Sequence, residues 1–309
     1  LSSLQSEKKR IELNEKLIKY TLILAAAISI LTTFGILFSI LFEAIEFFQL
    51  RSFWYFLTGT IWSPGVANSQ FGALPIFAGT FVITIIALLV AIPIGLGSAI
   101  YMSEYASPKF RDYLKPILEI LAGIPTVVYG FFAAITVAPL VVKVAAFFGL
   151  EATFNSALAS GIVMGIMIIP LISSLSDDVI RAVPDSQRKA AFALGMTHGE
   201  TIKNIVIPSA MPGIISASLL ALSRALGETM IVVMAAGLRP NLSWNPLEDM
   251  TTVTVTIVNS LVGDFEFNSP ETLSAFALGL VLFIVTLILN MISLSLIRKF
   301  KEKYKVNTL

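Results

Sequence analysis

Six long apolar runs constrain the fold of this chain more than any other feature of its sequence. Each run holds roughly 20 or more predominantly apolar residues, the length that an α-helix needs to cross the hydrocarbon core of a bilayer. The runs lie at about 20–42, 74–101, 117–142, 157–176, 209–237 and 272–297. The sequence therefore predicts an all-α, polytopic membrane protein with six transmembrane helices.

The composition supports the same fold class. Hydrophobic residues make up 56% of the 309 residues and charged residues only 13%, whereas about a quarter of a soluble domain is charged. The chain has no cysteine and one histidine, so we expect no disulfide, no thiol chemistry, no metal site and no cofactor. The membrane assignment, more than the net charge of +1, argues against a nucleic-acid partner and implies contact with membrane lipid.

Basic residues are distributed unevenly between the apolar runs, and membrane proteins retain lysine and arginine on the cytoplasmic side. Of the 21 basic residues, 17 fall near the two termini and in the segments 103–115 and 177–208. The alternate loops hold only Arg51, Lys143 and Arg239. We therefore expect a cytoplasmic N-terminal segment at 1–19 without a cleavable signal, a transmembrane domain at 20–297 and a cytoplasmic tail at 298–309.

One polar segment, 185–208, lies between two of the apolar runs. Gly195 suits a helix C-terminus, and Thr197 with Glu200 three residues later forms a capping box that starts another helix. Pro208 marks the beginning of the next element. We expect a helix-loop-helix on the cytoplasmic surface, where another protein docks.

Two further segments are unusual for transmembrane or loop sequence. Residues 122–130 place one proline and two glycines in the third run, which predicts either an opened backbone that lines a cavity or a plain packing kink. Glu119, about one turn inside that run, is expected to reach toward the interface. The alternation of threonine and valine at 251–256 is typical of a strand, although a short amphipathic helix is equally compatible.

Arg224 and Glu228 are charged residues inside the fifth run. Arg224 is expected near the bilayer centre, where a charge costs about 2.5–3.5 kcal/mol. Because Glu228 follows four residues later, the two side chains would share one helix face and form an ion pair. Either the pair is structural, or the Arg224 guanidinium lines a polar path and offers paired donors to a tetrahedral oxyanion while Glu228 orients it.

The polar segment 185–208 resembles the coupling loop of bacterial ATP-binding-cassette importer permeases. The matching positions are Lys189, Ala190, Ala191, Gly195, Ile205, Ile207 and Pro208. That family usually has Glu where this chain has Lys189 and Leu where it has Ile207. The resemblance implies that Lys189, Ala190, Ala191, Gly195 and Pro208 couple the chain to an ATPase, whereas His198 is expected to be solvated.

Four other motifs together resemble the permease subunits of the high-affinity bacterial phosphate importer, and the C-type subunit more than the A-type. They are the segments 71–75, 100–105, 123–130 and 224–229, within a similarity that spans roughly 20–300. The resemblance implies the fold of a type I importer permease. It also implies a substrate path lined by Arg224, Glu228, Thr229, Thr126 and Tyr129.

The resemblance further implies three partners: a second homologous permease (PstA-like), a cytoplasmic ATPase dimer (PstB-like) and an extracytoplasmic phosphate-binding protein (PstS-like). The sequence contains no P-loop glycine-lysine motif, so a partner must hydrolyse ATP. We therefore expect a non-enzymatic permease subunit of an ATP-driven phosphate importer in the bacterial plasma (inner) membrane.

Three alternatives remain open at the level of sequence. Arg224 alone does not select phosphate over sulfate, molybdate or phosphonate. An intramembrane enzyme could use Glu119 and Glu228 as acid and base, but no cysteine, second histidine or nucleophile motif accompanies these carboxylates. A structural or signalling membrane subunit would leave the coupling loop without a purpose.

Overall fold

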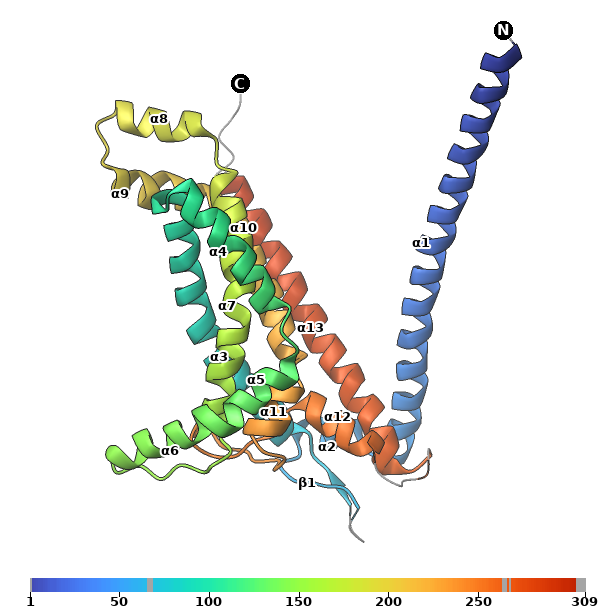
Figure 1. Ribbon diagram of the computed structural model, residues 1–309. Helices are drawn as coiled ribbons and strands as arrows, with labels where there is room; N and C mark the ends of the chain where they lie inside the picture. Colours follow the sequence, from blue (N-terminus) through green and yellow to red (C-terminus); the bar gives the residue numbers. More distant parts are fainter. Residues whose placement is uncertain (1, 66–68, 263–265, 267, 304–309) are drawn as a thin grey trace.

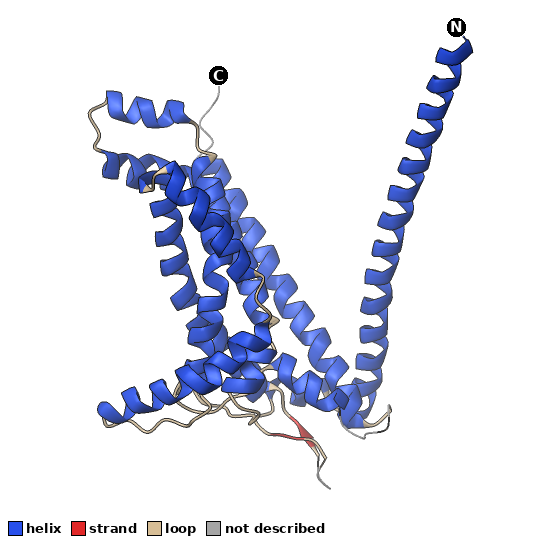
Figure 2. Ribbon diagram, viewed as in Figure 1, coloured by secondary structure: helices blue, strands red, loops and turns tan. Residues whose placement is uncertain are grey.

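A computed structural model describes residues 2–65, 69–262, 266 and 268–303 of the chain. Most of the described chain is helical, as Figure 2 shows, and one short antiparallel hairpin pairs Trp62 with Phe71 and Ser63 with Gln70. The elements in chain order are α1 (Ser2–Leu50), α2 (Phe53–Thr58), β1 (Trp62–Ser63), β2 (Gln70–Phe71), α3 (Leu74–Ile100), the π-helical η1 (Tyr101–Tyr105), α4 (Pro108–Ala122), α5 (Thr126–Phe132), the π-helical η2 (Ala133–Val137), α6 (Ala138–Phe147), α7 (Ala157–Arg181), α8 (Asp185–Ala193), α9 (His198–Thr201), the π-helical η3 (Ile202–Val206), α10 (Ile207–Leu226), α11 (Met230–Ala235), α12 (Val253–Val262) and α13 (Pro270–Lys303).

The prediction of six transmembrane helices is confirmed. Six helical runs in the described part of the chain are long and apolar enough to cross a membrane: Asn14–Leu50, Leu74–Tyr105, Thr126–Phe147, Ala157–Arg181, His198–Leu226 and Pro270–Lys299. Their bounds differ from the expected ones, and most strongly in the third and fifth runs. The third begins at Thr126 because α4 is a separate helix, and the fifth ends at Leu226 because the chain breaks before α11.

The core of the molecule is the contact between α3 and α7. Gly161 and Gly165 of α7 face α3 so closely that an added Cβ would lie 2.7 Å from Ile86 and 2.7 Å from Val90, respectively. Two small residues four positions apart let transmembrane helices approach in this way. Met164, Met167 and Ile168 are fully buried beside them. The helices α4, α5, α10 and α11 also pack on α7, so the α3–α7 pair is the centre of the bundle.

Helix α4 is fastened to α7 by charges near the end of α7. The Arg111 guanidinium donates to Asp177 Oδ2 at 3.0 Å, and Lys115 Nζ donates to Asp178 Oδ1 at 2.5 Å. The Asp177 side chain is almost fully buried, so its pair with Arg111 fixes α4 more strongly than the exposed Lys115–Asp178 pair.

Different elements lie at the two ends of the helical bundle. In Figure 1, the start of α1, the pair α8–α9 and the far end of α13 lie at one end, whereas α2, the β1–β2 hairpin, α6 and α12 lie at the opposite end. Helix α1 meets α13 at this second end and diverges from the bundle toward its start. The start of α1 and the far end of α13 therefore lie on the same side of the bundle as the predicted coupling loop.

Aromatic rings hold the hairpin end together. Phe47 of α1, Phe56 of α2 and Phe71 of β2 are buried, with ring centroids of Phe47 5.4 Å from Phe56 and 5.5 Å from Phe71. Trp62 packs against Phe71 at 5.6 Å. Edge-to-face contacts of this kind orient the hairpin firmly over the end of α13.

Candidate functional site

Two helices that each follow a break in the backbone, α5 and α11, pack against each other. The first break follows α4 at Gly123 and ends at Pro125, whose extended backbone precedes α5. The second break separates α10 from α11 at 227–229. Gly130 of α5 packs on α11 so closely that an added Cβ would lie 2.7 Å from Met234 Sδ. The segment 122–130 therefore contains an opened backbone between α4 and α5, and α5 packs on α11, the helix that follows the second break.

The Glu228 side chain caps α11. Its Oε1 accepts hydrogen bonds from the backbone N–H groups of Met230 at 2.9 Å and Ile231 at 3.3 Å, and the residue is 8% exposed. The expected ion pair with Arg224 is wrong, because α10 ends at Leu226 and the two residues no longer share a helix face. Within the described chain, no salt bridge joins Glu228 to any basic residue.

Arg224 is exposed in the last turn of α10. This position, two residues before the helix ends, differs from the expected place near the middle of a span, because the span starts and ends earlier than its hydropathy indicates. Among the described residues, no carboxylate lies within salt-bridge distance of its guanidinium.

The other predicted path residues lie around the same two breaks. Tyr129 Oη donates to the Leu121 carbonyl at 2.9 Å and so satisfies one of the open carbonyls at the end of α4. Thr126 is the first residue of α5, and Thr229 directly precedes α11. All three are half-buried. The structure therefore gathers the five residues on adjoining segments, with Arg224 as their exposed cation and Glu228 as a backbone cap.

Sequence reasoning missed Thr254 as a neighbour of this site. The segment 251–256 is helical from Val253 onward, which agrees with the helix alternative and not with a strand. Thr254 Oγ1 donates to the Glu228 carbonyl at 2.8 Å, and Thr80 Oγ1 of α3 accepts from Val253 N at 3.0 Å. The run of threonines was the available signal, but helical spacing was needed to identify which of them faces Glu228.

The local signals in the segment 185–208 predicted its shape well. Helix α8 ends at a Schellman motif, in which Gly195 has φ +81° and Met196 N donates to the Ala191 carbonyl at 3.2 Å. Thr197 and Glu200 form the expected capping box. Pro208 is the second residue of α10 and so marks the start of that element as expected, although α9, η3 and α10 follow one another in one long helical run.

The predicted coupling residues of α8 do not all point the same way. Lys189, Ala190 and Gly195 are exposed, whereas Ala191 is 3% exposed and packs inside the chain. Phe192 and Leu194 are exposed apolar residues on the same segment. The outward surface of this segment therefore combines small and apolar residues with the exposed polar residues Asp185, Ser186 and Lys189.

His198 is exposed, as expected for a solvated residue, but it also makes specific contacts. Its Nε2 lies 3.2 Å from the Glu104 carbonyl, and its ring packs edge-on against Tyr105 at 5.2 Å and stacks near Phe192 at 6.2 Å. The ring therefore joins η1, α8 and α9.

Residues 91–305 match the model of a known protein family, described as the inner membrane component of binding-protein-dependent transport systems. That match covers more than half of the chain. The chain belongs to this family. The recognition of an importer permease from the coupling loop is thereby confirmed.

Curated relatives of this inner membrane component are similar over most of their length. A probable ABC transporter permease protein, YqgH of Bacillus subtilis, is 35% identical over 81% of this chain and 78% of its own length. The phosphate transport system permease protein PstC of Mesorhizobium japonicum is 34% identical over 86% of this chain and 84% of its own. The PstC protein of Haemophilus influenzae is 30% identical over 93% and 94% of the two chains.

Solved structures show the same fold for this inner membrane component. A bacterial alginate ABC transporter, solved in complex with a pentasaccharide-bound periplasmic protein, gives a TM-score of 0.61 at 14% identity, covering 91% of this chain and 94% of that chain. The inward-facing MetNI methionine ABC transporter gives 0.53 at 15% identity, covering 74% and 94%. The fold is that of type I ABC importer permeases.

Arg188 is a second residue that sequence reasoning missed. Its Nη2 donates to Glu104 Oε1 at 2.9 Å and to the Ile180 carbonyl at 3.0 Å, and its Nη1 donates to the Val183 carbonyl. The Glu104 side chain is 6% exposed and that of Arg188 is 16% exposed. In this inner membrane component, the buried guanidinium thus fastens α8 to the end of α7 and to η1.

Proposed function

We propose that this chain is the C-type permease subunit of an ATP-driven importer of inorganic phosphate. The observation that carries the proposal is the exposed Arg224, which lies in the last turn of α10, directly before a break in the helix, and has no carboxylate partner in the described chain. The similarity to phosphate transport permeases over most of both chains supports phosphate as the anion.

The arrangement around Arg224 favours an oxyanion over a cation. A guanidinium presents paired N–H donors whose geometry fits the oxygens of a tetrahedral anion. Glu228 directs its charge at two backbone N–H groups and so does not neutralise Arg224. In a site of low dielectric, an unneutralised positive charge attracts an anion much more strongly than it would in water.

Hydroxyl groups complete the proposed path. Thr126 and Thr229 stand at the starts of the two short helices α5 and α11, and Tyr129 belongs to the first of them. A hydroxyl both donates and accepts, so these groups suit a phosphate oxygen whether or not it carries a proton. Arg224 is the proposed electrostatic anchor, and the hydroxyls are its polar surroundings.

The outward surface of α8 is the proposed contact with a cytoplasmic ATPase dimer. Lys189, Ala190 and Gly195 face outward there, beside Phe192 and Leu194. A surface that combines small, apolar and polar residues at the end of a transmembrane bundle fits the groove of a partner protein. A second, homologous permease and an extracytoplasmic phosphate-binding protein complete the proposed importer.

The test is uptake of labelled phosphate and of labelled sulfate by vesicles that contain the whole complex. The unmodified complex should import phosphate, and Arg224→Gln should lower that uptake at least about tenfold, the equivalent of one lost charged contact. Arg239→Gln is the matched control, because Arg239 is also exposed but lies in the loop after α11. Uptake of sulfate in preference to phosphate would assign a different anion, and normal phosphate uptake by a well-expressed Arg224→Gln complex would remove Arg224 from the path.

A further inference from the structure

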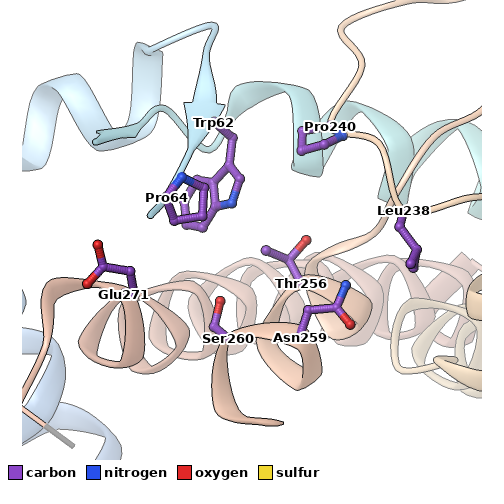
Figure 3. A pocket seen from close by; sticks show the side chains of 8 residues that line it. All are labelled: Trp62, Pro64, Leu238, Pro240, Thr256, Asn259, Ser260 and Glu271. Carbon is purple, nitrogen blue, oxygen red and sulfur yellow. The ribbon is translucent and has the colours of Figure 1, made fainter. Parts of the chain in front are cut away.

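A cavity of about 310 Å³ lies at the hairpin end of the molecule, between the β1–β2 hairpin and α12. Figure 3 shows the Trp62 and Pro64 side chains on one side of it and the side chains of α12 and Glu271 on the other. Its lining residues come from four segments: Trp62, Pro64, Leu238, Pro240, Thr256, Asn259, Ser260 and Glu271. The volume is at the lower end of the range for small-ligand sites, so the cavity suits one side chain better than a large molecule.

The chemistry of the lining favours a cation. Glu271, in the first turn of α13, is half-buried and forms no salt bridge within the described chain. The Trp62 indole is held from behind by Phe56 and Phe71, with centroids 6.3 and 5.6 Å away. An aromatic face and a carboxylate together bind ammonium and guanidinium groups. None of the eight lining residues is basic, so the cavity does not suit phosphate.

The charge of the surrounding segments points the same way. The loops at this end, 43–73, 143–156 and 238–271, hold eight aspartates and glutamates but only three basic residues. Such a surface repels a free oxyanion and attracts a basic protein surface. The same charge pattern places this end outside the cytoplasm, where an importer receives its substrate from a carrier.

We propose that the cavity receives a lysine or arginine side chain of the extracytoplasmic binding protein. The cationic group would pair with Glu271 beside the Trp62 ring, and its aliphatic stem would lie along Pro64, Pro240 and Leu238. Asn259 and Ser260 supply acceptor oxygens for the remaining N–H groups. The identity of this partner rests on the proposed function, whereas the charge and shape of its docking group follow from the cavity.

One helix connects the cavity with the candidate path. Thr256, Asn259 and Ser260 of α12 line the cavity, and Thr254 of the same helix donates to the Glu228 carbonyl at 2.8 Å. A side chain that enters the cavity therefore contacts α12, the helix that is hydrogen-bonded to Glu228 in the break between α10 and α11. Docking at this place can thus act on the path through a rigid element of two to three turns.

The test is the affinity of the phosphate-loaded binding protein from the same organism for the whole complex in lipid nanodiscs. Glu271→Lys should raise the Kd by about tenfold or more and Glu271→Gln by less, because reversal adds repulsion to the loss of a charge pair. Glu266→Lys is the matched control: Glu266 is an exposed carboxylate of the same loop outside the cavity lining, and we expect less than about a twofold change from it. Restoration of binding to the Glu271→Lys complex by a lysine-to-glutamate or arginine-to-glutamate change in the binding protein would identify the docking group.

Three results would overturn the proposal: no binding to the unmodified complex, unchanged binding by Glu271→Lys, or equal weakening by Glu271→Lys and Glu266→Lys. Phosphate uptake by the unmodified complex is measured in parallel. Normal uptake together with unchanged binding by Glu271→Lys refutes the docking site alone, whereas absence of phosphate uptake refutes the proposed function. Retention of basal ATP hydrolysis by each variant complex shows that the subunits have assembled.

Discussion

Glu228 illustrates how a single residue changes its role when a helix ends. Its carboxylate accepts two backbone N–H groups of α11, so we predict that Glu228→Ala destabilises the protein by about 1–3 kcal/mol, the cost of leaving buried donors without an acceptor. Glu228→Gln keeps one acceptor oxygen and should cost less. Thermal unfolding in nanodiscs measures both, and equal stability of the alanine variant and the unmodified protein would contradict the capping role.

The same pair of residues offers an internal control. If Arg224 and Glu228 formed an ion pair, Glu228→Gln would repair part of the damage caused by Arg224→Gln, because no unpaired charge would remain. The structure contains no such pair. We therefore expect the two changes to be additive in stability to within about 0.5 kcal/mol.

Glu248 makes the loop before α12 sensitive to acid. Hydrogen bonds from the side chains of Asn241, Ser243 and Asn245 lower the pKa of the Glu248 carboxyl. A lowered folded-state pKa means that these bonds stabilise the loop fully above the unfolded value of about 4.3 and are lost as pH falls through the folded value. A dye on Leu242→Cys should report loosening of the loop below about pH 4, and Glu248→Gln should flatten this pH dependence. If the dye signal had the same pH dependence in the Glu248→Gln variant, Glu248 would not be the group that makes the loop sensitive to acid.

At the scale of helices, the sequence predicts the number of spans but not where two of them break. Hydropathy averages over the short break at 123–125 and continues through the apolar residues 230–236, so it merges α4 with α5 and α10 with α11. Caps depend on residues a few positions apart, and the Gly195 and Thr197–Glu200 signals were therefore predictive. The burial of Ala191 and the contacts of Arg188 depend on packing with distant segments, which no local pattern encodes.

The Arg188–Glu104 pair links α8 to η1 through an ion pair with a buried carboxylate. Since Glu104 is 6% exposed, Arg188→Ala leaves a buried carboxylate without its cation, and we predict a loss of about 3–5 kcal/mol in stability. Arg188→Ala combined with Glu104→Gln removes the charge and should recover much of that loss. Thermal unfolding checks both variants. A double variant no more stable than Arg188→Ala would show that the bonds to Ile180 and Val183, and not the ion pair, hold α8.

The whole molecule is polarised along the bundle. Basic residues gather at the end that carries α8, α9, the start of α1 and the far end of α13, whereas the loops at the end that carries the hairpin and α12 hold eight acidic but only three basic residues. The charge pattern could be counted from the sequence. The cavity beside Glu271 could not, because its eight lining residues come from segments as far apart as Trp62 and Glu271.

The orientation in the membrane is a prediction of this polarity, and the absence of native cysteine allows a direct test. Lys189 of α8 and Glu151 of the loop between α6 and α7 are both exposed and belong to opposite ends of the bundle. Retention of lysine and arginine in the cytoplasm places Lys189 inside and Glu151 outside. In intact cells, a membrane-impermeant maleimide should therefore label Glu151→Cys and leave Lys189→Cys unlabelled until the membrane is opened.

Because both thiols would be exposed in a folded protein, equal labelling of the two variants after solubilisation would confirm that access to the reagent, and not burial of the thiol, makes the difference. Labelling of Lys189→Cys in intact cells, with protection of Glu151→Cys, would invert the protein and would move the cavity beside Glu271 to the cytoplasmic side, out of reach of an extracytoplasmic partner.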